Sequence, residues 1–243
     1  MREKLNWGVI GTGGIATDFA DALVRSARCR LVNVVGSAPA KSRAFADRWR
    51  LPKSADTLAE LLADPAVDAV YVATPHPAHE AQALACIQAR KAVLCEKPLT
   101  MDANSAGRLI EAARAANVFL MEAFMYRSHP LMARLIGCVR DGAIGTIRHV
   151  RADFAFRVPR DPKGRLFDLT LGGGGILDVG GYPVSFARLI AGLVENKPVA
   201  DPVVFEGIGK LGPTASAERA PALLRCASGC ASPIRDWVFR WAC

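Results

Sequence analysis

The first half of the chain alternates short apolar runs with segments whose apolar residues recur at helical spacing. That alternation is typical of βαβ units built around a parallel sheet. The run Val67–Ala73 is nearly all apolar, as expected for a strand covered on both faces. We expect strands at Leu5–Ile10, Leu31–Val35, Val67–Ala73, Ala92–Cys95 and Val118–Glu122, with helices at Gly14–Ala27, Ala40–Trp49, Pro77–Ala89 and after the cap Asp102 to Ala116. This pattern predicts a doubly wound α/β domain over residues 1–122.

The pattern changes after residue 122 and predicts a second domain of the α+β class over residues 123–243. Leu131–Asp141 has helical spacing, and Thr146–Arg157 alternates as a strand does. A glycine run that begins at Gly172 leads into an apolar helix ending near Leu193, and Val203–Ile208 is strand-like.

Composition and charge favour an intracellular globular protein. Lys and Arg number 31 and Asp and Glu 23, so the net charge is +8. We find no uninterrupted apolar run of the roughly 18 residues that a membrane helix needs, and no signal-peptide segment after the first charges. We therefore expect a cytoplasmic protein without a membrane partner.

Basic residues gather in the middle third of the chain, where Phe154 and Phe156 lie between arginines. Such a patch can bind nucleic acid, but no recognised nucleic-acid-binding module accompanies it, and we expect none bound. The seven cysteines form no CxxC pair, and no histidine follows Cys226 and Cys230. We therefore expect neither a disulfide framework nor a metal site.

A glycine-rich turn follows the first predicted strand and fits the pattern GxGxxA. In this pattern Gly11 permits a tight turn, Gly13 lets a pyrophosphate approach the backbone, and Ala16 permits close packing of helix on strand. The free N–H groups at the helix start then face the phosphates. The predicted contacts are Gly11, Thr12, Gly13, Gly14, Ile15 and Ala16.

The end of the second strand indicates which dinucleotide binds. NAD enzymes usually place an acidic residue about 20 residues after the glycines, where it holds the ribose 2′-hydroxyl. Here no acidic residue occurs between Asp21 and Asp47, whereas Ser37 and Lys41 could hold a 2′-phosphate. The alternative is that Lys41 is only a surface residue. We favour NADP over NAD.

A charged pair, Glu96 and Lys97, directly follows an apolar strand and precedes Pro98. Ligands of open α/β sheets lie beyond the carboxyl ends of the strands, so Lys97 would face the nicotinamide and serve in proton transfer. Taken alone, an ordinary exposed lysine in a turn fits equally well.

Four motifs in order resemble the Gfo/Idh/MocA oxidoreductases: the glycine turn, Ala73-Thr-Pro-His76, Glu96-Lys-Pro98, and Gly174-Gly-Ile-Leu-Asp178-Val-Gly-Gly-Tyr182. The run Met121–Arg127 and the tyrosine at 182 are most similar to the branch of dimeric dihydrodiol dehydrogenases and NADP-dependent xylose dehydrogenases. The resemblance covers roughly residues 5 to 212. It implies a Rossmann domain followed by an open, mainly antiparallel sheet, with the active site between the domains.

The resemblance also implies roles for individual residues. Lys97 matches the catalytic lysine of the family, and Asp178 and Tyr182 match the ends of its D-x-x-x-[HY] pattern. The spacing of four between Asp178 and Tyr182 independently puts them on one face of a helix, although a helix cap and a core aromatic would also fit. The implied cofactor contacts are Thr74, Pro75, His76, His79, Glu96 and Arg127.

These residues give a hypothesis for function. A nicotinamide cofactor exchanges a hydride with a secondary alcohol or hemiacetal carbon of a sugar, polyol or cyclic diol. Tyr182 accepts the hydroxyl proton, Lys97 favours the anionic oxygen forms, and Asp178 orients a second hydroxyl. The alternative is a protein that binds the cofactor without turnover, as a sensor or an inactive member of the family.

The C-terminal segment departs from the family pattern, because Pro213, Pro221 and Pro233 interrupt any strand and the family usually continues further. Within this segment Ala222–Gly229 still resembles a strand and turn of the family, whereas Arg235–Cys243 does not. We expect a truncated second domain whose sheet is incomplete. A homodimer is expected from the family, but the shortened C-terminus speaks against it.

Overall fold

The computed structural model describes residues 4–226 and 236–242, with only the backbone for 226 and 236–242. The chain divides into two compact units, Met1–Ala123 and Phe124–Cys243, called here the first and second unit.

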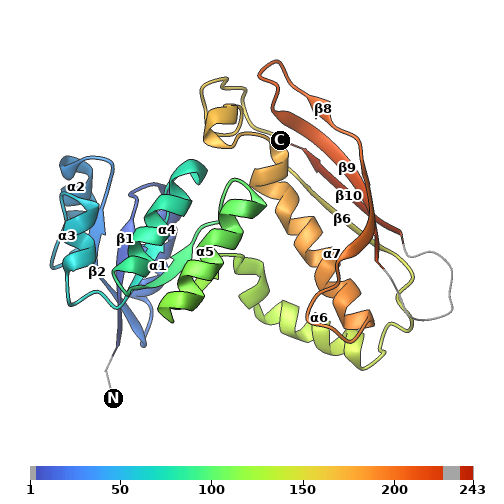
Figure 1. Ribbon diagram of the computed structural model, residues 1–243, viewed down its shortest axis with the longest axis horizontal. Coiled ribbons are helices and arrows are strands. Elements are labelled where there is room, and N and C mark those ends of the chain that lie inside the picture. Colours follow the sequence, from blue (N-terminus) through green and yellow to red (C-terminus); the bar gives the residue numbers. More distant parts are fainter. Residues whose placement is uncertain (1–3, 227–235, 243) are drawn as a thin grey trace. The chain divides into compact units, whose positions relative to one another are not determined.

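The first unit contains a parallel sheet of five strands in the order β2-β1-β3-β4-β5 (Figure 1). Its elements in chain order are β1 (Leu5–Ile10), α1 (Gly14–Val24), β2 (Cys29–Val35), α2 (Pro39–Trp49), α3 (Leu58–Ala63), β3 (Ala69–Val72), the 3₁₀ turn η1 (His76–Ala78), α4 (His79–Gln88), β4 (Ala92–Cys95), α5 (Ala103–Ala116) and β5 (Leu120–Glu122).

Helices cover both faces of this sheet because its strands are apolar on both sides. Val9 packs with Ala16 and Phe45 on the face covered by α1 and α2. Ile10, the next residue of β1, belongs to the cluster on the other face with residues of α3, α4 and α5. The predicted doubly wound fold is thereby confirmed.

The predicted elements of this unit match the structure apart from their ends and one helix. β1 and β4 have the expected bounds, and the Asp102 carboxylate caps α5 by accepting the Ser105 N–H at 2.9 Å. The helix α3 was missed. Its signal was present as a capping box, because Thr57 accepts the Glu60 N–H and Glu60 accepts the Asp56 N–H.

The second unit packs two helices against one face of an open, mainly antiparallel sheet. The sheet order is β6-β10-β9-β7, with β8 paired to β9, and only β6 and β10 are parallel. The elements are the 3₁₀ turn η2 (Met125–Ser128), α6 (Pro130–Arg140), β6 (Val150–Ala155), the 3₁₀ turn η3 (Leu169–Leu171), the π-helical turn η4 (Ile176–Gly180), α7 (Gly181–Val194), β7 (Pro202–Gly207), β8 (Lys210–Leu211), β9 (Ala217–Cys226) and β10 (Asp236–Ala242).

The expectation that prolines exclude strands near the C-terminus was wrong. β9 runs through Pro221, and β10 follows where no strand was expected. The Pro221 carbonyl accepts the Ile208 N–H at 3.1 Å, and Ile208 directly follows the last residue of β7. The missing N–H of Pro221 is on the same side, so it costs no hydrogen bond to a residue of β7. Pro233, Cys230 and Cys243 lie outside the described residues.

One helical stretch, Leu169–Val194, is long and apolar enough by composition to cross a membrane, and half of it is buried within the protein. It consists of η3, η4 and α7, with glycines between η3 and η4. Ala187, Ile190 and Ala191 of α7 belong to the core of the second unit, together with Leu224 of β9. These contacts are those of a core helix.

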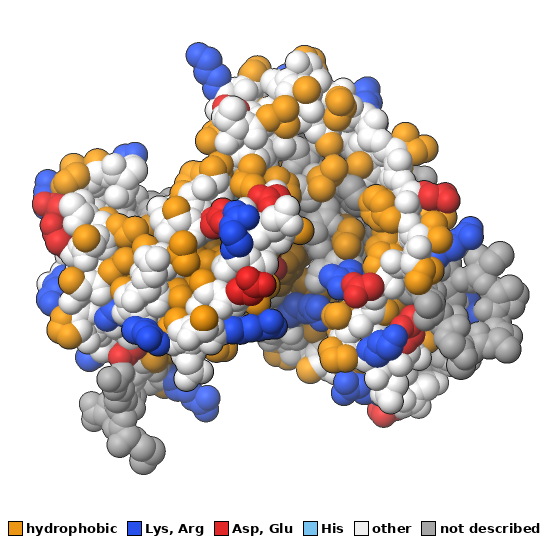
Figure 2. Space-filling view, viewed as in Figure 1, with side chains coloured by type: hydrophobic (Ala, Val, Ile, Leu, Met, Phe, Trp, Pro, Cys, Tyr) orange, Lys and Arg blue, Asp and Glu red, His pale blue; other side chains and the backbone are white. Residues whose placement is uncertain are grey.

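Charged side chains do not segregate on the face shown in Figure 2. Basic groups are scattered there among acidic and hydrophobic ones. Of the basic residues in the middle third, Arg151 pairs with Asp153, and Arg160 with Glu218.

Candidate functional site

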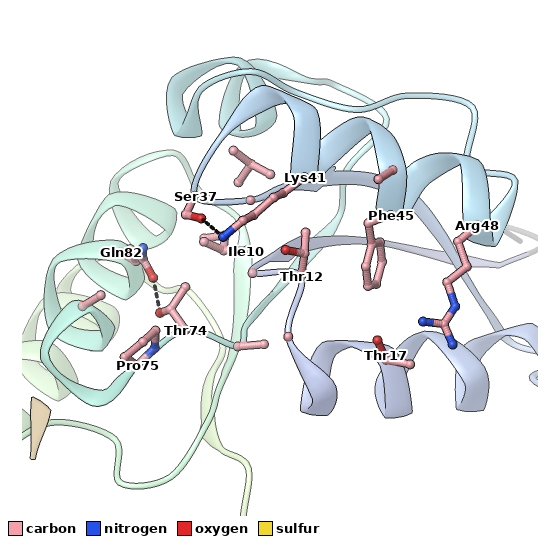
Figure 3. A pocket seen from close by; sticks show the side chains of 17 residues that line it. Ile10, Thr12, Thr17, Ser37, Lys41, Phe45, Arg48, Thr74, Pro75 and Gln82 are labelled. Atoms are coloured by element: carbon pink, nitrogen blue, oxygen red, sulfur yellow. Dashed lines mark hydrogen bonds between the residues drawn. The ribbon is translucent and has the colours of Figure 1, made fainter. Parts of the chain in front are cut away.

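The first unit has a cavity of about 770 Å³ at the carboxyl ends of its strands (Figure 3). Its walls include the turn after β1, the end of β2 with the start of α2, and the loop after β3. It contains seven of the residues predicted to bind a cofactor, namely Gly11, Thr12, Gly13, Ser37, Lys41, Thr74 and Pro75.

Two glycines shape the floor of this cavity in different ways. Gly11 has a φ of +111°, and a Cβ there would lie 2.5 Å from the Ala73 carbonyl oxygen, so only glycine fits. A Cβ on Gly13 would meet no protein atom within 4 Å. The space beside Gly13 is therefore open to a ligand, whereas the requirement at Gly11 comes from the fold.

The N-terminus of α1 can bind an anion through its free backbone N–H groups. Gly13 is the cap residue, no side chain caps the helix, and no acidic residue lies in its first turn. The first N–H groups of a helix have no partners within the helix and carry the positive end of its dipole. Of the other predicted contacts on this helix, Ala16 is buried in the core and the Ile15 side chain is exposed, so Gly14 and Ile15 offer their backbone.

Ser37 and Lys41 lie together at the end of β2, where the Lys41 ammonium donates to the Ser37 hydroxyl at 3.2 Å (Figure 3). Across the cavity, the Thr74 hydroxyl donates to the Gln82 side chain at 2.6 Å. No carboxylate lines the cavity among the residues that the structure describes. Electrostatics at the end of β2 therefore favour an anionic group.

Several residues that line the cavity were not predicted from the sequence, because they belong to no recognised motif. They are Thr17, Gly36, Phe45, Arg48 and Gln82. Phe45 and Arg48 follow Lys41 on α2 at intervals of four and three residues, which is the helical spacing that puts them on one face. That spacing was the available signal.

Lys97 stands on a turn after β4 that neighbouring strands hold in place. The Glu96 carboxylate accepts the Tyr71 hydroxyl at 2.5 Å and the Lys97 N–H at 3.2 Å. From β5, the Glu122 carboxylate accepts the Leu99 N–H at 2.8 Å. The turn therefore receives support from β3 and from β5.

Burial perturbs two groups that hold this turn. Burial and the hydrogen bond to Glu96 raise the pKa of Tyr71, which stays a neutral donor. Burial raises the pKa of Glu122, the nearby Glu96 charge adds to this effect, and the Leu99 N–H and Lys97 oppose it. Neither Tyr71 nor Glu122 was among the residues predicted from the sequence.

The two predicted histidines lie behind the cavity rather than in its wall. His76 on η1 is 7% exposed, and His79 at the start of α4 is fully buried. The two ring nitrogens of His79 lie 2.8 Å from the carbonyl oxygens of Thr74 and Pro98.

In the second unit, Tyr182 lies within a group of aromatic rings. The centroid of its ring is 5.2 Å from that of Phe124, 5.3 Å from Phe154 and 5.9 Å from Tyr126. A pocket of about 180 Å³ is lined by Tyr182 and by Tyr126, Ala152, Asp153, Phe154, Pro183 and Phe186. The aromatic neighbours were not predicted.

Asp178 lies on η4, one helical turn before Tyr182, and is 4% exposed. Its carboxylate pairs with the Arg165 guanidinium at 2.9 Å. Arg127 lies on η2 with its guanidinium 5.8 Å from the centre of the Tyr126 ring. Lys97 belongs to the first unit and Tyr182 to the second, so their convergence stays a prediction.

Comparisons with known proteins agree with this geometry. A family described as "Oxidoreductase family, NAD-binding Rossmann fold" matches residues 5–124. The C-terminal domain of the same family, GFO/IDH/MocA, matches residues 132–231.

Among curated relatives, a trans-1,2-dihydrobenzene-1,2-diol dehydrogenase of Mus musculus is 35% identical over 227 residues, which are 93% of this chain and 66% of the relative. The protein of the same name from Xenopus tropicalis is 37% identical over 76% of this chain and 56% of its own length. The chain thus spans less than two thirds of the length of these relatives.

Solved structures show the same arrangement of elements. An aldose-aldose oxidoreductase from Caulobacter crescentus, complexed with glycerol, is 26% identical with a TM-score of 0.87, covering 98% of this chain and 71% of its own. A 3-ketoreductase from Actinomadura kijaniata, in complex with NADP, is 28% identical with a TM-score of 0.82, covering 98% and 70%. With a glycine turn at the start of α1, a lysine turn after β4 and matches to both domains, the chain belongs to the Gfo/Idh/MocA oxidoreductase family.

Proposed function

We propose that this protein is an NADP-dependent oxidoreductase that acts on CH–OH groups. The observation that carries the proposal is the position of two features on one edge of one sheet. The cavity with Ser37 and Lys41 lies beyond β1, β2 and β3, and the turn with Lys97 follows β4. Carboxyl ends of parallel strands form the ligand edge of such sheets, so the lysine stands beside the nucleotide cavity.

The cavity suits NADP at both the pyrophosphate and the 2′-phosphate. The uncapped start of α1 offers N–H groups to a pyrophosphate, and the space beside Gly13 lets it approach. The Lys41 ammonium and the Ser37 hydroxyl offer donors to a 2′-phosphate, and no carboxylate among the described lining residues would repel it. The related 3-ketoreductase structure in complex with NADP supports the same choice over NAD.

When bound, the nicotinamide supplies hydride transfer to or from the substrate carbon. The positive charge of Lys97 stabilises negative charge that develops on the substrate oxygen. Hydrogen bonds to Glu96 and Glu122 fix the turn that carries this lysine. Tyr182 in its phenolate form takes the hydroxyl proton during oxidation, and the resulting phenol returns it during reduction. Asp178, held by Arg165, orients a neighbouring hydroxyl.

The substrate class that we propose is a sugar, polyol or cyclic diol. Phe124, Tyr126 and Phe154 surround Tyr182 and offer apolar faces on which a ring can stack. The names of the relatives, which mention dihydrobenzenediols and aldoses, support this class. We further propose that the protein is cytoplasmic and that its partners are small molecules.

The experiment that tests the proposal measures binding and turnover together. Fluorescence enhancement of NADPH reports binding, and absorbance of NADPH reports reduction of NADP⁺ by a panel of sugars, inositols and cyclic diols. We expect binding and turnover with at least one class of the panel. Binding without turnover across the panel would instead support the alternative, a cofactor-binding protein that is not an enzyme.

Replacing Lys97 with Met separates the lysine from the nucleotide cavity. Met keeps a long side chain but cannot stabilise an oxyanion, so we expect turnover to vanish while the dissociation constant of NADPH changes little. Lys91, which donates to the Asp64 and Val67 carbonyls far from the turn, provides the matched control Lys91→Met. Retention of most turnover in Lys97→Met would reject the catalytic role.

A further inference from the structure

His79 is the buried group whose contacts the proposed chemistry does not use. Its ring is fully buried at the start of α4. Both ring nitrogens have close oxygen neighbours: Nδ1 lies 2.8 Å from the Pro98 carbonyl oxygen, and Nε2 lies 2.8 Å from the Thr74 carbonyl oxygen. Carbonyl oxygens accept hydrogen bonds and never donate them.

These two contacts restrict the protonation of the ring. A neutral imidazole carries one N–H and one lone pair, so one of its nitrogens would direct a lone pair at a carbonyl oxygen 2.8 Å away. An imidazolium donates from both nitrogens and satisfies both oxygens. Two acceptors at hydrogen-bond distance therefore match a ring that donates from both nitrogens.

The two carbonyls belong to the loops that matter for the proposed function. Thr74 begins the loop after β3, which lines the nucleotide cavity with Pro75. Pro98 directly follows Lys97 on the turn after β4. His79 therefore bridges the wall of the cavity and the base of the catalytic lysine from behind, without facing the cavity itself.

We propose that His79 is a positioning residue that carries protons on both ring nitrogens and ties the loop after β3 to the lysine turn. The double hydrogen bond of His79 is inferred from the two contacts alone. The expected effect of His79 on turnover rests on the proposed role of Lys97. Loss of either bond frees one loop relative to the other. A displacement of about 1 Å at a reacting group can lower turnover by about 100-fold.

The protonation state is tested on the full chain without any assay of activity. The chain has four histidines, so ¹⁵N labelling of histidine gives four imidazole signals. The variants His76→Asn, His129→Gln and His149→Gln each remove the signals of one ring, which identifies the remaining signals as those of His79. We expect proton couplings on both nitrogens of His79. A nitrogen of His79 without a bound proton would overturn the proposal.

The positioning role is tested with His79→Gln and His79→Met, and His129→Gln serves as the matched control on α6. Gln keeps a hydrogen-bond donor in the ring's place, whereas Met can donate to neither carbonyl. We expect kcat to fall about 100-fold in Met and less in Gln, in proteins that still unfold cooperatively. Unchanged kcat in His79→Met would overturn the role. If the wild-type protein turns over no substrate, the proposed function fails, and the NMR result still decides the double donation.

Discussion

At the scale of the single residue, Lys41 supplies the charge that we propose for selection of the dinucleotide. Its ammonium reaches Ser37 at the end of β2, in a cavity without a described carboxylate. Acidic residues at this place would hold the ribose hydroxyls of NAD. On this proposal, Lys41 is the cation that selects NADP over NAD.

Replacing Lys41 with Ala removes this cation. A charge-assisted hydrogen bond contributes about 1.5–3 kcal/mol, so we expect the affinity for NADP⁺ to fall about 10- to 150-fold while the affinity for NAD⁺ is unchanged. Isothermal titration with both cofactors measures the difference. Arg43 lies on the same helix and pairs with Asp56 outside the cavity, which makes Arg43→Ala the control. An equal loss of affinity for NAD⁺ would show that Lys41 does not bind the 2′-phosphate.

Glu122 links pH to stability. Burial raises its pKa above the ordinary value, so the native state binds the proton more tightly than the unfolded state does. Its contribution to stability is complete below the ordinary carboxyl pKa and is lost as pH rises through the raised value.

We expect Glu122→Gln to be more stable than the wild type at neutral pH and no more stable in acid, because the amide oxygen still accepts the Leu99 N–H without a buried charge. Urea unfolding at acidic and neutral pH measures the effect, with the exposed Glu111→Gln on α5 as control. If Glu122→Gln is less stable than the wild type at neutral pH, the prediction is contradicted.

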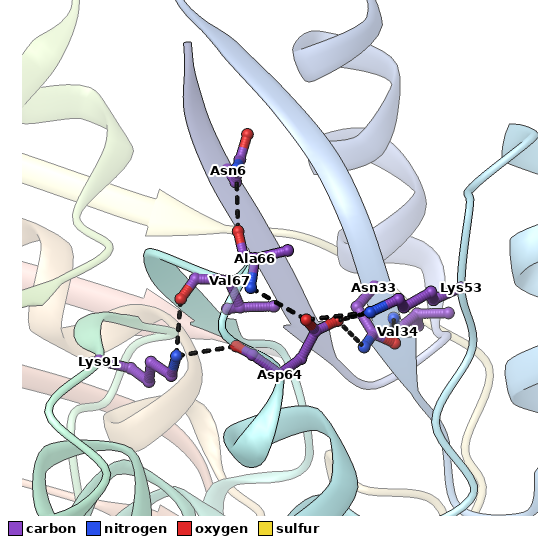
Figure 4. A network of polar contacts seen from close by, with 8 residues as sticks. All are labelled: Asn6, Asn33, Val34, Lys53, Asp64, Ala66, Val67 and Lys91. Carbon is purple, nitrogen blue, oxygen red and sulfur yellow. Dashed lines mark hydrogen bonds and ion pairs between the residues drawn. The ribbon is translucent and has the colours of Figure 1, made fainter. Parts of the chain in front are cut away.

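At the scale of the element, a buried carboxylate fixes the connection between α3 and β3. Asp64 accepts hydrogen bonds from the Asn33 amide at 3.0 Å, from the Lys53 ammonium at 3.1 Å and from the Ala66 N–H at 2.9 Å (Figure 4). The Lys91 ammonium donates to the Asp64 and Val67 carbonyls. Side chains from β2, from the segment before α3 and from the segment before β4 therefore meet at one turn.

The same network gives the stability of the first unit a second dependence on pH. Burial alone would raise the pKa of Asp64, but the hydrogen bonds from Ala66, Lys53 and Asn33 outweigh it and hold this pKa below its ordinary value. A carboxylate with a lowered pKa stabilises the fold above the ordinary carboxyl pKa, and this stability is lost as pH falls through the lowered value.

We expect Asp64→Ala to lower the free energy of unfolding by about 1–3 kcal/mol at neutral pH, because the Asn33 amide and the Ala66 N–H lose their acceptor. The loss should shrink in acid. Asp56→Ala, which breaks an exposed ion pair with Arg43, should change stability by less than about 1 kcal/mol. Denaturant titrations of both variants provide the measurement, and an equal loss in the two would contradict the role of burial.

At the scale of the whole molecule, local patterns predicted the elements better than they predicted the contacts between them. The glycine turn, the bounds of β1 and β4 and the cap at Asp102 were visible because each depends on neighbouring residues. The partners of the lysine turn were not, because Tyr71 and Glu122 lie 25 and 23 residues from their bonding partners. No spacing rule in a single sequence connects such positions.

The second unit shows the same division. Its alternating and apolar segments predicted β6, β7 and α7. The part of β9 from Ala222 onward was expected only through the resemblance to the family, and the part before it was missed because Pro221 argued against a strand. Asp178 and Tyr182 were found through their motif, but Arg165 and the aromatic rings around Tyr182 reach them from other elements. The motif therefore indicated these two residues but not the side chains that contact them.

Gly13 shows that folding and ligand recognition make separable demands on one short turn. Its neighbour Gly11 is fixed by the protein's own backbone, but nothing in the first unit crowds a methyl group at position 13. The vacant volume there matters only to an incoming phosphate. A side chain introduced at position 13 would therefore change the affinity for the ligand and leave the folding of the protein unchanged.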